Sequence, residues 1–173
     1  MRKNAVLLLA MGFFLTSRSF PGAAAENRIP FHGLKAVGVF VEDIDPEASK
    51  DGLNKEQIKT DVESRLCAAG IKVVPVEKSL SLPTSSYLYV IVNTAKFVSG
   101  LEYVYGTTVQ LKQVVMLERK KPVKSAYLWA TTWEKSGGVE ITWVADLAVN
   151  VRSQINDTVD AFIGDYLAEN PKK

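Results

Sequence analysis

The sequence has one cysteine and one histidine, Cys67 and His32, and this scarcity excludes several classes of protein. A single cysteine cannot form a disulfide bond within the chain, so packing must stabilise the fold. We interpret Cys67 as a small buried hydrophobic residue in a helix. A single histidine excludes zinc sites of the H-E-x-x-H type, and G-x-G-x-x-G, P-loop and G-x-S-x-G motifs are also absent. We therefore predict no catalytic residue and no cofactor, and the balance is against an enzyme.

The chain also lacks a large excess of charge, because 21 basic residues face 19 acidic ones. Three of the basic residues (Arg2, Lys3 and Arg18) fall in residues 1–25, and removal of that segment leaves 18 basic residues and a net charge of −1. Such a balance gives no electrostatic basis for nucleic-acid binding.

Residues 1–25 have the pattern of a signal peptide. A positive start is followed by an apolar run over 5–15 and a small-residue end at 22–25, which predicts cleavage before Glu26. The apolar run is shorter than the roughly 20 residues that span a bilayer. We therefore predict an exported protein, periplasmic or secreted, with no stable membrane anchor after cleavage, and a single α/β domain over 26–173.

The first half of that domain reads as a βαβ unit. A strand is predicted over 34–42, and a helix begins after the N-cap Asn54, with Gln57 completing a capping box and Gly70 ending the helix. A second strand is predicted over 71–76. Strands joined in this way are parallel, with a right-handed crossover.

The second half reads as an antiparallel meander followed by a helix. Strands are predicted over 86–97, 102–117 and 125–135, with a bulge near Gly106 and turns at 99–100 and 137–138. An apolar stripe predicts the last helix over 143–169. The expected fold is a two-layer α/β (α+β) sandwich, in which two helices cover one face of a five-stranded mixed sheet and leave the other open.

Tyrosine and tryptophan recur at every second residue in the predicted meander, which places them on one parity of each strand. From these residues we predict a contact surface on the open face, formed by Tyr89, Tyr105, Trp129 and Trp133. Its partner would be a protein or glycan of the cell envelope, or a second copy of the chain in a structural homodimer. The alternative stays open that this parity faces the helices and serves packing alone.

An acidic loop follows the first predicted strand and supports a competing hypothesis. Asp43, Asp45 and Glu47 offer carboxylate oxygens of the kind that divalent cations prefer, at the end of a parallel strand. A small hydrolase or metal-dependent enzyme would use these residues. Their spacing is not that of an EF-hand, and a solvated acidic loop is the favoured interpretation.

Several short motifs resemble those of a family of short exported bacterial proteins of unknown function. They are located at 51–53 (DGL), 69–71 (AGI), 87–90 (YLYV) and 162–167 (FIGDYL). The βαβ opening and the meander are also similar to the N-terminal domain of the periplasmic translocation protein TolB, which implies a fold and no activity. Together these observations predict an exported, non-enzymatic binding or assembly module.

Overall fold

The computed structural model describes residues 29–80, 86–116 and 127–171, so the predicted signal peptide lies outside the described residues. Within them, one mixed sheet has four strands in the order β1-β2-β3-β4. The strands are β1 (Gly38–Val41), β2 (Ser86–Lys96), β3 (Glu102–Met116) and β4 (Tyr127–Trp143). β1 pairs with β2 in parallel, and the pairs β2–β3 and β3–β4 are antiparallel. The α/β class and the mixed sheet are confirmed.

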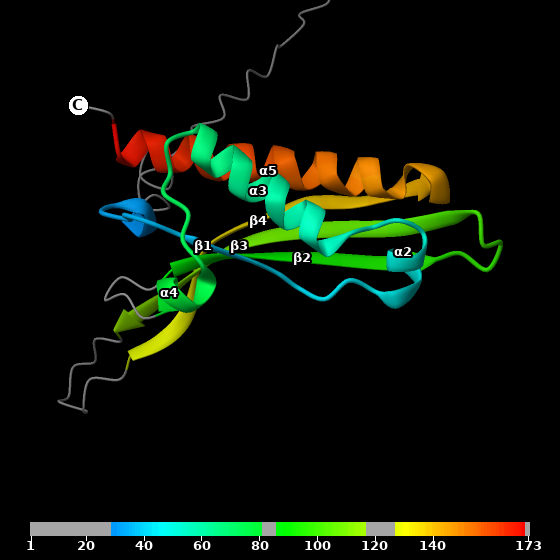
Figure 1. Cartoon of the computed structure of the whole chain (residues 1–173), viewed down its shortest axis with the longest axis horizontal. Helices are drawn as coiled ribbons and strands as arrows, with labels where there is room; N and C mark the ends of the chain where they lie inside the picture. The colour runs from blue at the N-terminus through cyan, green and yellow to red at the C-terminus, as the bar shows by residue number, and fades with distance from the viewer. Residues whose placement is uncertain (1–28, 81–85, 117–126, 172–173) are drawn as a thin grey trace, which may run out of the picture.

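Two long helices, α3 (Lys55–Ala68) and α5 (Leu147–Glu169), pack on the same face of the sheet, as Figure 1 shows. Short helical segments complete the described fold: η1 (Ile29–Phe31), α2 (Pro46–Lys50), α4 (Val76–Leu80) and η2 (Val144–Asp146). No helix of the described residues combines the length and the apolar character needed to cross a membrane.

Helix α3 begins and ends where its sequence signals predict. The Asn54 side chain accepts a hydrogen bond from the Gln57 backbone N–H at 3.0 Å, which satisfies one of the unpaired donors at the helix start. Gly70 follows the helix with φ +83°, a conformation that costs glycine little. The buried side of α3 consists of Ile58, Val62 and Leu66. Cys67 is exposed, so the prediction that it is buried is wrong.

The predicted strand over 71–76 is not a strand. Its contact with the sheet is an isolated parallel bridge between Val37 and Val73. Pro75 has no N–H to continue a ladder, and α4 begins at the next residue. α4 then packs over Gly38, where a Cβ atom would lie 3.1 Å from the Val76 Cα. The predicted fifth strand is therefore absent from the described residues.

The predicted turn at Gly137-Gly138 is instead a bulge within β4. The register moves from Thr107–Gly138 to Thr108–Ser136, so Gly137 is the extra residue. The predicted irregularity close to Gly106 thus arises in the partner strand. As a result β4 extends to Trp143, and the last helix starts later than expected.

Two ion pairs connect the long helices on their outer side. The Arg65 guanidinium (α3) lies 2.7 Å from the Asp160 carboxylate (α5), and the Arg152 Nε (α5) lies 2.6 Å from the Asp61 carboxylate (α3). All four side chains keep contact with solvent, so each pair contributes little to stability.

Candidate functional site

Two of the four predicted contact residues lie under the helices. The Tyr105 side chain is 2% exposed, and its hydroxyl donates to Glu140 Oε2 at 2.7 Å. Trp133 packs edge-on against Phe31 and Phe162, with ring centroids 6.2 and 5.4 Å away, and its Nε1 donates to Asp165 at 3.0 Å. The prediction that Tyr105 and Trp133 share an open face with Tyr89 and Trp129 is therefore wrong.

The opposite face carries a line of aromatic side chains, which we call the aromatic row: Phe40, Tyr89, Tyr87 and Trp129. Phe40 stacks on Tyr89 with a centroid distance of 5.5 Å. Tyr87 contacts Tyr89 at 6.4 Å and Trp129 at 5.3 Å. The row thus continues from β1 to β4, and Phe40 and Trp129 at its ends remain 42% and 43% exposed.

Two lysines lie over the rings of the aromatic row. The ammonium of Lys55 is 5.4 Å from the centre of the Phe40 ring, and that of Lys112 is 5.7 Å from the centre of the Tyr89 ring. Partial burial raises the pKa of the Tyr89 hydroxyl, and a hydrogen bond with Glu42 raises it further. Tyr89 is therefore neutral at physiological pH. The carboxylates of Glu42 and Asp43 lie near the same ring, so the two ammonium groups do not leave this end of the face with an excess of positive charge.

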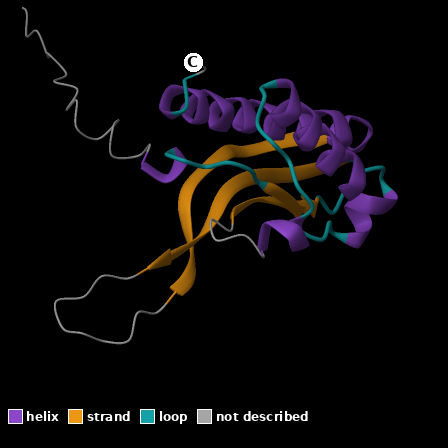
Figure 2. Cartoon of the chain, turned by 60° about the vertical axis from the view of Figure 1, so that its left-hand side comes forward, coloured by secondary structure: helices purple, strands orange, loops and turns teal. Residues whose placement is uncertain are grey.

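At its other end, the same face is apolar and hollow. Val139, Ile141 and Trp143 of β4 are 77%, 63% and 57% exposed. Small residues around Gly106 leave a hollow of about 350 Å³ beside them. Among the described elements, α4 covers only the Gly38 edge of this face, and the long helices lie on the other side (Figure 2). Exposed apolar side chains therefore occur at both ends of this face, and polar side chains lie between them.

The three carboxylates of the acidic loop have separate partners in the described structure. Asp43 pairs with Lys55 at 2.5 Å, which lowers the pKa of its carboxyl group. Asp45 caps α2 by accepting from the backbone N–H groups of Glu47 and Ala48 at 2.8 and 3.2 Å. Glu47 is exposed, 3.9 Å from Lys96. No group of three His, Cys, Asp or Glu side chains in the described ranges is placed to hold a metal ion.

A small polar cluster links the start of the covered face to the loop before α3. The Asp51 carboxylate accepts from the Lys96 ammonium and from the Tyr103 hydroxyl, both at 2.7 Å. The hydrogen bond from Lys96 is the main reason why the pKa of Asp51 is lowered, and the bond from Tyr103 lowers it further. The bond between Lys96 and Asp51 also raises the pKa of Lys96. Burial and the Asp51 carboxylate raise the pKa of the Tyr103 hydroxyl. We interpret this cluster as a structural anchor.

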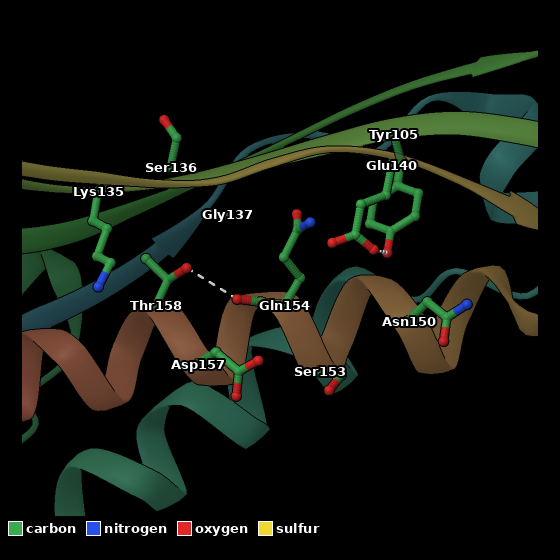
Figure 3. A pocket seen from close by; sticks show the side chains of 10 residues that line it. All are labelled: Tyr105, Lys135, Ser136, Gly137, Glu140, Asn150, Ser153, Gln154, Asp157 and Thr158. Carbon is green, nitrogen blue, oxygen red and sulfur yellow. Dashed lines mark hydrogen bonds between the residues drawn. The ribbon is translucent and has the colours of Figure 1, made fainter. Parts of the chain in front are cut away.

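A polar pocket of about 390 Å³ lies between β4 and α5 (Figure 3). The strands contribute Tyr105, Lys135, Ser136, Gly137 and Glu140, and α5 contributes Asn150, Ser153, Gln154, Asp157 and Thr158. Gln154 is 7% exposed, and its Oε1 accepts from the Thr107 hydroxyl at 2.7 Å. Sequence reasoning missed this pocket. The sequence feature that could have indicated it is Gln154, a polar residue that falls in the apolar stripe of the helix beside Val151 and Ile155.

Comparisons with known proteins give little about this chain. No protein-family model matches it, and no curated protein matches it. Among solved structures it is similar to a PelC variant from Paraburkholderia phytofirmans, solved as a dodecamer, with 19% identity over 80% of this chain and 88% of that chain and a TM-score of 0.36. A likeness at this level carries no inference about function or assembly, and the two resemblances drawn from the sequence stay predictions.

Proposed function

We propose that this protein is an exported, non-enzymatic binding module whose contact surface is the face of the sheet opposite α3 and α5. The aromatic row carries the proposal: four rings in continuous contact remain outside the core although aromatic side chains strongly favour burial. Tyr89 and Trp129 keep the role predicted for them, and Phe40 and Tyr87 take the places of Tyr105 and Trp133. Export to the periplasm or the medium is supported by the pattern of residues 1–25.

The partner proposed for this face is another protein. Exposed apolar side chains that cluster on one surface among polar neighbours mark interaction sites. Here the aromatic row and the exposed Val139, Ile141 and Trp143 lie on one side of one sheet. Polar pairs lie between these two groups of apolar side chains and supply hydrogen-bonding groups. Gln110 Nε2 donates to Glu134 Oε2 at 2.5 Å, and the hydroxyls of Thr108 and Ser136 are 3.0 Å apart. Aromatic anchors with polar neighbours are typical of protein interfaces.

A binding experiment with two variants tests the proposal. Trp129→Ala removes one end of the aromatic row, and Val149→Ala removes a 66% exposed side chain from α5 on the opposite side of the molecule. We expect wild type and Val149→Ala to capture the same envelope protein and to bind it after purification. Trp129→Ala should weaken that binding at least tenfold, because aromatic anchors dominate interface energies. Equal binding by both variants would contradict the proposal.

Sedimentation of the purified protein separates this function from a homodimer. A monomer at micromolar concentration that binds the captured protein agrees with the proposal. A dimer that dissociates in Trp129→Ala, with no other protein captured, would replace the separate partner by a second copy. Binding of envelope polysaccharide alone, lost in the same variant, would replace it by a glycan.

A further inference from the structure

The pocket between β4 and α5 contains a buried hydrogen-bond donor that no group of the described structure satisfies. The Gln154 side chain is more than nine-tenths buried, and its Nε2 has no hydrogen-bond partner among the described residues. The other end of the amide is fixed by the Thr107 hydroxyl at 2.7 Å. Buried polar groups in native proteins almost always have partners, so this donor calls for one.

Backbone geometry at Gly137 is adapted to the Gln154 side chain. A Cβ atom at residue 137 would lie 2.3 Å from Gln154 Cγ and 2.5 Å from its Cδ, so a side chain there would displace Gln154. The β-bulge at Gly137 therefore leaves space for Gln154 to reach the sheet. Figure 3 shows this side chain rising from α5 toward β4, with the Glu140 carboxylate directed into the same space. A donor and an acceptor thus face one pocket.

The ionised groups that line the pocket narrow the chemistry of its occupant. One oxygen of Glu140 accepts from Tyr105 at 2.7 Å, and a carboxylate has further lone pairs to offer. Two carboxylates, Glu140 and Asp157, outnumber the single ammonium group of Lys135, so the lining is net negative and disfavours an anion. A simple ammonium ligand, in turn, has no acceptor for the Gln154 amide. A hydroxyl or a carboxamide meets both demands, because each accepts and donates.

We propose that this pocket binds a small neutral ligand, a polyol or a carboxamide, which accepts from Gln154 Nε2 and donates to Glu140. The volume of about 390 Å³ falls within the range of small-molecule sites and is more than one ordered water requires. The pocket opens on the helix side of the sheet, so the proposal does not depend on the aromatic row.

Nuclear magnetic resonance of the Gln154 side-chain amide tests the proposal. The probes are sorbitol and glycerol for the polyols, and L-glutamine and acetamide for the carboxamides. Gln154→Met identifies the resonance by removing it. We expect one of the two classes to shift this resonance saturably, with a dissociation constant of roughly 1 mM or tighter.

A matched pair of variants on β4 decides whether the shift reports the proposed contact. Glu140→Gln changes the acceptor in the pocket and should weaken binding about tenfold, since hydrogen bonds to charged groups are the stronger ones. Glu134→Gln makes the same change on the opposite face and should leave the affinity unaltered. If no probe shifts the resonance, or if both variants bind like wild type, the pocket holds water alone and the proposal is overturned.

Discussion

The two faces of the sheet have similar residues and different surroundings. On the helix side, Tyr103 and Tyr105 are buried, and the rings of Trp133 and Phe162 contact each other at 5.4 Å. On the other side, the rings of the aromatic row contact one another equally closely and remain in contact with solvent. Aromatic content therefore does not distinguish core from surface in this protein. The position of the helices distinguishes the core from the surface. Substitutions on the two faces can test this difference in burial.

The largest effect is expected from Phe162→Ala on the covered face. Phe162 is fully buried and contacts both Phe31 and Trp133. Its removal leaves a cavity at the centre of the core, so the free energy of unfolding should fall by about 3–5 kcal/mol. Urea denaturation followed by far-ultraviolet circular dichroism measures the change. A loss below about 1 kcal/mol would show that the covered face is not a packed core.

A matched pair of tryptophans compares the two faces directly. Trp133→Ala removes packing and a hydrogen bond to Asp165 and should cost about 3 kcal/mol. Trp129→Ala removes a 43% exposed side chain that contacts Tyr87, and the expected loss of stability is about 1 kcal/mol or less. The same denaturation experiment serves both. The reverse order of effects would mean that the faces are assigned the wrong way round.

A second matched pair deletes one hydroxyl from each face. Tyr105→Phe removes the bond to Glu140 and should lower the free energy of unfolding by about 1 kcal/mol. The Tyr87 hydroxyl has no hydrogen bond within the described part of the chain, so Tyr87→Phe should change stability by less than about 0.5 kcal/mol. Equal losses in the two variants would contradict this distinction.

The smallest effect is expected in the acid limb of the pH–stability profile. The pKa of Asp51 is lower in the folded protein than in the unfolded chain. Its carboxylate therefore adds to the free energy of unfolding above the unfolded pKa of about 3.9, and this contribution is lost as the pH falls through the lower folded pKa. Asp51→Asn should flatten the loss of stability in that acid range. Urea midpoints from neutral to acid pH measure it, with Asp157→Asn, at an exposed position, as the control. Parallel profiles for wild type and Asp51→Asn would contradict the assignment.

Much of the fold follows from local sequence signals. Asn54, Gln57 and Gly70 predict α3, because capping chemistry is decided within a few residues. The strands β2 and β3 were predicted within one residue of their ends, since turn residues separate them. The segment 71–76 was mistaken for a strand because its apolar character suits a strand and the packing of α4 over Gly38 is not visible locally. Likewise, Gly137-Gly138 resembles a turn until Gln154 is known to lie against it.

The candidate contact surface could be predicted only in part. Alternation within a strand assigns its residues to two faces. It does not say which of those faces is shared with a given set of residues in the next strand. That relation depends on the turn and on the bulges, and here it places Tyr89 and Tyr105 on opposite faces. Phe40 was missed because it lies in the first predicted strand, whereas the contact residues were chosen from the tyrosines and tryptophans of the meander. The bulge between Thr131 and Trp133 likewise separates Trp129 from Trp133 in a way that period-two counting does not detect.

The two ion pairs between α3 and α5 form in only one alignment of the two helices. A displacement by one turn, about 5.4 Å, would bring Asn156 and Gly164, or Ala148 and Asn156, to the places of Arg152 and Asp160. None of these residues is charged, so both pairs would be lost at once in either direction. The same displacement would move Gln154 away from Gly137. The ion pairs and the contact of Gln154 with Gly137 thus require the same alignment of α5, although the ion pairs add little to its stability.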